Sequence, residues 1–167
     1  SKGKSVVIGG WGWLLGDEGS GYWPGLPALK ATIRAFEGSG RPTSLQEPIL
    51  AQYGLKSRNE IILWAYNSSR QKDIAALAPI VLEHAQAKDP IAMTLVETAA
   101  YDLSVKVATI RHQLNMENLP IAFAGSLLTN DTPLSALLCD LLKLNKRPEP
   151  KHSAVIGAAI LALNKRP

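Results

Sequence analysis

Apolar residues follow a helical spacing over most of this chain. The clearest case lies between residues 90 and 116, where apolar positions recur every three or four residues: Ala92, Leu95, Val96, Ala99, Leu103, Val107, Ile110 and Leu114. Asp89 and Pro90 come directly before this pattern. Aspartate is a favoured N-cap, and proline is favoured as the first helical residue. The pattern therefore predicts a long helix from about Pro90 to about Met116.

Shorter helical patterns flank the long one. We predict helices at residues 26–36, 44–54, 58–67, 74–82, 134–144 and 154–163. Pro24 and Pro27 should make the first helix begin between them or kink there, because an interior proline removes a hydrogen bond. Pro79 should break or bend its helix for the same reason. The last helix, AVIGAAILAL, is apolar throughout, so we expect it to be a buried closing helix.

Two short apolar segments differ from the helical ones. Residues 5–8 (SVVI) are mostly β-branched and run into glycines, and residues 120–124 run into Gly125 and Ser126. Both are typical of a strand that meets a turn. Strands that are few and each followed by helices predict an α/β chain with a helix-rich insertion.

Composition narrows the class of protein. The 167 residues are 46% hydrophobic and 19% charged, as in an ordinary globular domain, and the longest apolar run is too short to span a membrane. Cys139, the single cysteine, cannot form an internal disulfide, which favours a cytoplasmic location. The net charge of +4 comes from scattered basic residues without interleaved aromatic ones, so we expect no nucleic-acid partner.

The chemistry is concentrated near the N-terminus. Residues 9–23, GGWGWLLGDEGSGYW, hold six glycines, three tryptophans and the pair Asp17–Glu18. Glycine lets a backbone approach a ligand closely, a carboxylate accepts hydrogen bonds from hydroxyls, and an indole can pack on the C–H face of a sugar. A sugar site is one interpretation, and a turn with two aromatic residues in the core is the other. We interpret Glu18 as structural, through the charge of a helix N-terminus.

The same stretch resembles the signature of the N-acetylglucosamine kinases and the wider BadF/BadG/BcrA/BcrD ATPases, in the superfamily of sugar kinases, actin and Hsp70. The resemblance continues in IAALAPIVLEHAQAKDPIA, PIAFAGSLL and AVIGAAILAL. It implies a ribonuclease H-like (actin-like ATPase) fold. Residues 1–167 would form a single C-terminal lobe of a two-lobe kinase, with the N-terminal lobe absent from this chain.

The resemblance also implies an activity, the ATP-dependent phosphorylation of N-acetylglucosamine or a related amino sugar. By position, Gly10, Trp11 and Asp17 would contact the sugar, and Gly125 and Ser126 would pack against the adenosine of ATP. Mg²⁺ would arrive with ATP, and no residue here is assigned to metal binding. No residue matches the family's catalytic base or its two phosphate-binding hairpins, so we expect the isolated chain to be inactive.

Several alternatives stay open. The chain could belong to a non-catalytic nucleotide-binding or oligomerising module, its helical insertion could form a homodimer, and Gly125–Ser126 could be a simple capped turn. Some members of the group carry an iron–sulfur cluster, which needs several thiolates. Cys139 lies among leucines, so we interpret it as a buried hydrophobe. His84, His112 and His152 match no metal-ligand spacing.

Overall fold

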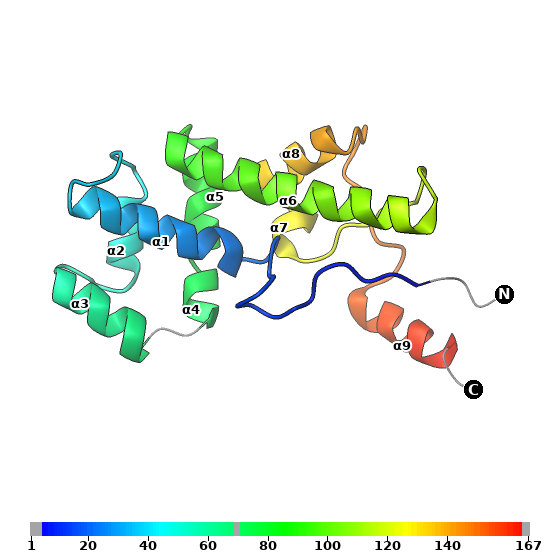
Figure 1. Cartoon of the computed structure of the whole chain (residues 1–167), viewed down its shortest axis with the longest axis horizontal. Helices are drawn as coiled ribbons and strands as arrows, with labels where there is room; N and C mark the ends of the chain where they lie inside the picture. Colours follow the sequence, from blue (N-terminus) through cyan, green and yellow to red (C-terminus); the bar gives the residue numbers. More distant parts are fainter. Residues whose placement is uncertain (1–4, 69–70, 165–167) are drawn as a thin grey trace.

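The computed structural model describes residues 5–68 and 71–164, and every regular element within them is helical (Figure 1). The elements are α1 (Tyr22–Phe36), α2 (Gln46–Gln52), α3 (Arg58–Leu63), η1 (Trp64–Ser68), α4 (Gln71–Ala75), α5 (Ala78–Gln86), α6 (Pro90–Leu114), α7 (Ser126–Thr129), α8 (Pro133–Leu141) and α9 (Ala154–Asn164). The π-helical turn η1 continues α3 without a break.

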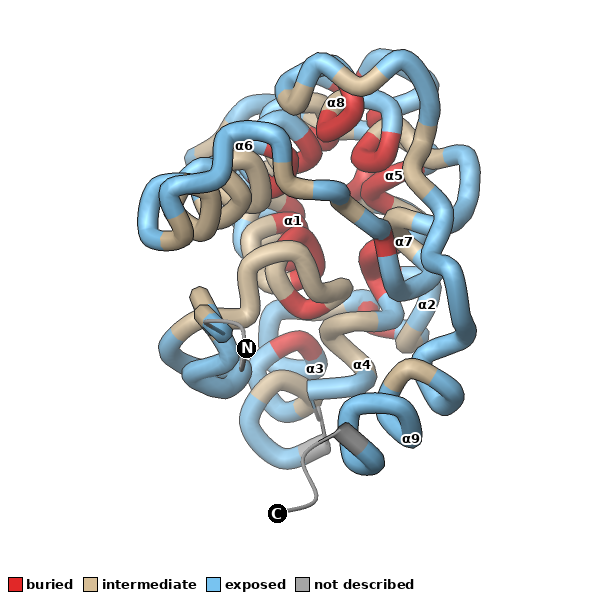
Figure 2. Tube along the Cα trace, turned by 90° about the vertical axis from the view of Figure 1, so that its right-hand side faces the viewer, coloured by how far each residue is buried: buried red, intermediate tan, exposed pale blue. Residues whose placement is uncertain are grey.

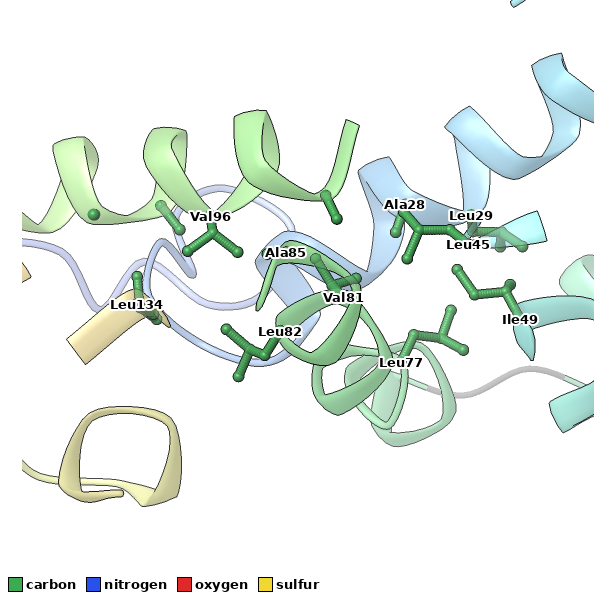
Figure 3. Packing of buried hydrophobic residues seen from close by; sticks show 13 residues of the cluster. Ala28, Leu29, Leu45, Ile49, Leu77, Val81, Leu82, Ala85, Val96 and Leu134 are labelled. Carbon is green, nitrogen blue, oxygen red and sulfur yellow. The ribbon is translucent and has the colours of Figure 1, made fainter. Parts of the chain in front are cut away.

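The main core lies where α1, α2, α5, α6 and α8 bring their apolar faces together (Figure 3). Its members are Ala28, Leu29, Leu45, Ile49, Leu77, Val81, Leu82, Ala85, Ala92, Val96, Ala99, Ala100 and Leu134. Burying one large aliphatic side chain contributes about 1.5–3 kcal/mol, so this cluster is the main source of the bundle's stability. Two smaller clusters lie beside it, one around Ile61 and one around Phe123.

The long helix is confirmed. α6 begins at Pro90, and Oδ1 of its N-cap Asp89 accepts hydrogen bonds from the backbone nitrogens of Ile91 and Ala92, both at 2.9 Å. The shorter helices predicted before and after it are confirmed as α2, α3 with η1, and α8. The break near Pro79 is also confirmed, because α4 ends at Ala75 and α5 begins at Ala78.

The predicted start of the first helix is wrong. α1 begins at Tyr22, before both prolines and not between them. Pro24 lies in the first turn, where an amide hydrogen would have no helical partner, so it costs no hydrogen bond. Pro27 lies inside the helix and removes the bond to the carbonyl of Trp23.

The two predicted strands are wrong for the described residues, which contain no strand. A strand forms through a ladder of backbone hydrogen bonds with a neighbouring strand. Among residues 5–68 and 71–164, segments 5–8 and 120–124 do not pair with each other, and the nitrogen of Phe123 instead donates to the carbonyl of Pro148 (3.3 Å). Val7 is 82% exposed. Neither segment therefore forms a strand, and the α/β prediction is confirmed only in its helical part.

The closing helix is present, but the prediction that it is buried is wrong. α9 is a helix, but it stands apart from the bundle with exposed residues along its length (Figure 2). Its exposed apolar side chains are Val155, Ile156, Ile160, Leu161 and Leu163. An apolar sequence allows a helix to be buried but does not show what would cover it. No described residue covers α9.

Candidate functional site

The stretch of residues 9–21, called the glycine loop here, leads from the extended N-terminal segment into α1. Four of its glycines have positive φ angles: Gly9 (+87°), Gly10 (+78°), Gly12 (+85°) and Gly19 (+91°). Residues with a side chain rarely adopt a positive φ angle, so the backbone conformation of the loop explains its glycine content. The carbonyl of Gly12 closes a turn by accepting from the nitrogens of Leu15 (3.2 Å) and Gly16 (3.0 Å).

Trp11 lies on the surface, with 76% of it exposed. Its indole ring lies close to Gly16: a Cβ added to this glycine would be 3.6 Å from Cδ1 of Trp11. Gly16 directly precedes Asp17, so the fold brings the indole next to the backbone that carries the carboxylate. Trp13 is 48% exposed and packs edge-on against Tyr22, with ring centroids 5.4 Å apart. The loop's aromatic residues are therefore not core residues, apart from the edge contact of Trp13.

Asp17 is half-buried and tied to the start of α1. Its Oδ2 accepts a hydrogen bond from Oγ of Ser20 at 2.6 Å, and that Oγ accepts from the nitrogen of Tyr22 at 3.2 Å. Within the described part of the chain, Oδ1 of Asp17 has no hydrogen-bond partner. A carboxylate held through one oxygen with the other open can accept a hydrogen bond from a ligand hydroxyl.

Glu18 is structural, but not through a helix N-terminus. Its Oε2 accepts from Nζ of Lys106 on α6 at 2.7 Å, and the first turn of α1 contains no acidic residue. The hydrogen bond from Lys106 holds the pKa of Glu18 below its ordinary value. Sequence reasoning missed Lys106, because a lysine on an amphipathic helix gives no sign of a partner 88 residues away.

Gly125 and Ser126 form a second, separate turn. Gly125 is the N-cap of α7 with φ +88° and ψ 146°, a backbone conformation that only glycine adopts readily. Both residues are exposed, and no side chain lies within 4 Å of where a Cβ of Gly125 would be. The turn keeps its place because Leu127 and Leu128 pack on the main core. It therefore offers an open stretch of backbone at the start of α7.

Leu103 on α6 contacts the glycine loop and a cluster near the second turn. A Cβ on Gly19 would overlap Cδ2 of Leu103, so the glycine loop lies directly on this side chain. Leu103 also packs against the cluster around Phe123, two residues before Gly125. α6 therefore packs against the glycine loop and against the cluster that contains Phe123.

The remaining candidates form no second site of their own. Ser20 bonds to Asp17, and Asp131 pairs with Arg147. Cys139 is buried as predicted, and burial raises the pKa of its thiol. Residues 5–68 and 71–164 contain no group of three His, Cys, Asp or Glu side chains that could hold a metal ion.

His84 takes part in a structural cluster. Its Nδ1 lies 2.6 Å from Oγ of Ser44, and Ser44 donates through its nitrogen (2.7 Å) and its Oγ (3.0 Å) to Oδ2 of Asp89. Thr43 adds a further hydrogen bond to this carboxylate. The cluster ties residues 43–44 to the N-terminus of α6.

A cavity of about 700 Å³ lies between α5, α6 and α8, away from the predicted site residues. Lys88, Glu97, Asp131, Asp140 and Arg147 line it together with apolar side chains of α6 and α8, so its charges are mixed. In the described part of the chain, no helix is both long enough and apolar enough to cross a membrane.

Comparison with known proteins places these features in a family. Residues 1–162 match the BadF/BadG/BcrA/BcrD ATPase family. The chain is 33% identical over 168 residues to the N-acetylmuramic acid/N-acetylglucosamine kinase of Clostridium acetobutylicum, and 32% identical over 178 residues to the N-acetyl-D-glucosamine kinase of Dictyostelium discoideum. These alignments cover 96% and 99% of this chain but 55% and 54% of the relatives. The chain thus spans about half the length of these relatives.

Solved structures agree with the sequence comparison. The crystal structure of a candidate N-acetylglucosamine kinase from Chromobacterium violaceum superposes with a TM-score of 0.71 at 30% identity, covering 92% of this chain and 50% of that one. A structure from Porphyromonas gingivalis shares the fold with a TM-score of 0.63 at 23% identity, covering 96% of this chain and 53% of that one. The chain therefore belongs to the BadF/BadG/BcrA/BcrD ATPase family.

Proposed function

We propose that this chain is the C-terminal part of an ATP-dependent kinase that phosphorylates N-acetylglucosamine or a related amino sugar. In this proposal the chain belongs to one lobe of the ribonuclease H-like (actin-like ATPase) fold. It supplies contacts to the sugar and to adenosine, and the catalytic base and the phosphate-binding hairpins lie outside it. The names of the two curated relatives support the reaction class.

The observation that carries the proposal is the exposed indole of Trp11, which lies close to Gly16, the residue before Asp17. The indole offers a flat apolar face, and Oδ1 of Asp17 is an open acceptor. A pyranose presents both a C–H face and hydroxyl donors, so this pair fits it better than it fits a purely apolar ligand. Gly10 has open space above its backbone, which lets a ligand approach the loop closely.

The adenosine contact is proposed at Gly125 and Ser126. A flat base can lie against a backbone only where no side chain intervenes, and the space around Gly125 is open. The positive φ angle of Gly125 would strain any other residue, so the turn and the open surface depend on the same glycine.

In the proposed reaction these residues act by positioning. Trp11 and Asp17 would orient the sugar so that its primary hydroxyl meets the γ-phosphate of ATP in line, and such positioning accounts for much of phosphoryl-transfer catalysis. The described residues offer no carboxylate cluster for a metal ion. Mg²⁺ is therefore proposed to arrive bound to the ATP phosphates, where it would neutralise charge. The homodimer and the cytoplasmic location stay predictions.

A coupled assay of ADP release by the whole protein tests the proposal, with N-acetylglucosamine, N-acetylmuramic acid, glucosamine and glucose as acceptors. We expect ATP-dependent phosphorylation of at least one amino sugar in preference to glucose, and none by residues 1–167 alone. Binding of ATP without transfer to any acceptor would instead support the non-catalytic module. Turnover by residues 1–167 alone would show that the essential groups are all present here.

A further inference from the structure

Lys106 holds the glycine loop from the side of α6. Its Nζ donates to Oε2 of Glu18 at 2.7 Å, and the two side chains are only 21% and 26% exposed. A partly buried pair of this kind is less screened by solvent than a surface one. The hydrogen bond lowers the pKa of Glu18, which agrees with a carboxylate held in its charged form.

The same ammonium lies against the other end of the loop. A Cβ placed on Gly9 would lie 2.7 Å from Nζ of Lys106, closer than real side chains approach. Gly9 and Glu18 are nine positions apart in the sequence, and Lys106 therefore touches the loop where it begins and where it turns towards α1. Leu103, one turn earlier on α6, fills the space beside Gly19. One face of a long helix thus holds three points of the loop.

The loop residues that contact Lys106 and Leu103 flank the proposed sugar contacts in the sequence. Trp11 lies between Gly9 and Glu18 in the sequence, and Asp17 directly precedes Glu18. The position of the Asp17 carboxylate therefore depends on where Glu18 is anchored. A displacement of about 1 Å at a binding group can lower catalytic efficiency by about a hundredfold.

We propose that Lys106 is a positioning residue for the amino-sugar site, which it sets through Glu18 without touching the sugar. The inference rests on the proposed function for its substrate. The ion pair itself and its two contacts with the loop are independent of which ligand binds.

The test compares four variants of the whole protein. Lys106→Met keeps most of the length of the side chain but removes its charge, and Lys106→Arg keeps the charge. The pair Glu18→Lys with Lys106→Glu reverses the ion pair, and Lys30→Met removes an exposed lysine of α1 as the matched control. Each variant is assayed for KM and kcat with N-acetylglucosamine and with ATP, and for hydrogen exchange in residues 9–21.

We expect Lys106→Met to raise the KM for N-acetylglucosamine about tenfold, with the KM for ATP changed less than twofold. Exchange in the glycine loop should become faster, while exchange in the core of α6 stays as in the wild type. Lys106→Arg should behave nearly as the wild type, the reversed pair should recover part of the loss, and Lys30→Met should change nothing.

Unchanged sugar KM and unchanged loop exchange in Lys106→Met would overturn the proposal. Equal losses for sugar and ATP would also overturn it, because they indicate a general structural defect. If the wild type phosphorylates no amino sugar, the proposed function fails, and the exchange measurement then decides separately whether Lys106 orders the loop.

Discussion

Ser20 donates a hydrogen bond from its Oγ to Oδ2 of Asp17 at 2.6 Å. The same hydroxyl accepts from the nitrogen of Tyr22, the first residue of α1, so the carboxylate is connected to a helix that packs in the main core. These two hydrogen bonds fix the orientation of the Asp17 carboxylate, although Asp17 lies in a loop. It also leaves Oδ1 as the oxygen that can meet a ligand.

Replacing Ser20 with alanine should weaken sugar binding without unfolding the protein. Loss of a hydrogen bond to a charged group costs about 1.5–3 kcal/mol when the bond is fully used, and part of this should be lost in sugar affinity. We expect the KM for N-acetylglucosamine to rise about fivefold or more, measured by the coupled assay. Ser39→Ala is the control, because Ser39 makes a similar 2.7 Å bond to Glu37 at an exposed position on another turn. Equal effects of the two substitutions would contradict the role of Ser20.

Gly19→Ala should be strongly destabilising. The new Cβ would overlap Leu103 and would require a φ angle of +91°, so overpacking and backbone strain add to about 3 kcal/mol. Gly12→Ala has a similar φ of +85° but no atom within 4 Å, so it should cost only about 1 kcal/mol. Urea unfolding monitored by circular dichroism measures both. If Leu103→Ala fails to rescue part of the Gly19→Ala loss, the contact is not the cause.

Asp89 should make stability depend on acid pH. Burial raises the pKa of this carboxyl, but hydrogen bonds from Ala92, Ser44 and Thr43 outweigh it and leave the pKa below its ordinary value. Asp89 therefore contributes its full stability above the unfolded pKa of about 3.9, and this contribution is lost as the pH falls through the lower folded pKa.

The measurement is urea unfolding of the wild type and of Asp89→Asn at pH 7 and at pH 3. At pH 7 the variant should be less stable by roughly 2 kcal/mol, because an amide is uncharged and has one acceptor oxygen where the carboxylate uses two. The difference should shrink at pH 3. Glu83→Gln, an exposed carboxylate on α5, should show neither effect. A difference that stays constant with pH would contradict this account of Asp89.

Substitutions in α9 should leave the stability of the bundle unchanged. Val155→Ser and Leu161→Ser alter side chains that are 79% and 63% exposed, so each should change the free energy of unfolding by less than about 0.5 kcal/mol. Leu77→Ala, in the fully buried core, should cost about 2–5 kcal/mol. Thermal unfolding of the three variants and the wild type measures these differences in stability. A large loss from the α9 substitutions would show that this helix packs on the bundle.

Local signals in the sequence predicted the helices well. Asp89 and Pro90 mark the start of α6 by capping and backbone geometry, and both effects act within a few residues. The break before α5 follows from Pro79 in the same way. The glycine content of residues 9–21 likewise has a local cause, the positive φ angles of the loop.

Apart from the start of α1, which depends on the local placement of Pro24 and Pro27, the errors and omissions concern long-range contacts. Residues 5–8 and 120–124 have the composition of strands, but a strand needs a partner that the composition does not supply. α9 has an apolar sequence, but nothing local states whether another segment covers it. The bond between Glu18 and Lys106 joins residues 88 positions apart, which no spacing rule within one sequence predicts.

The most direct test of the proposed sugar site is titration calorimetry of the whole protein and its Asp17→Ala variant with N-acetylglucosamine and with ATP. Loss of a charged acceptor that contacts a sugar hydroxyl costs about 2 kcal/mol, so sugar affinity should fall about thirtyfold while ATP affinity changes less than twofold. Unchanged sugar affinity would remove Asp17 from the site and contradict the assignment of the glycine loop to the sugar.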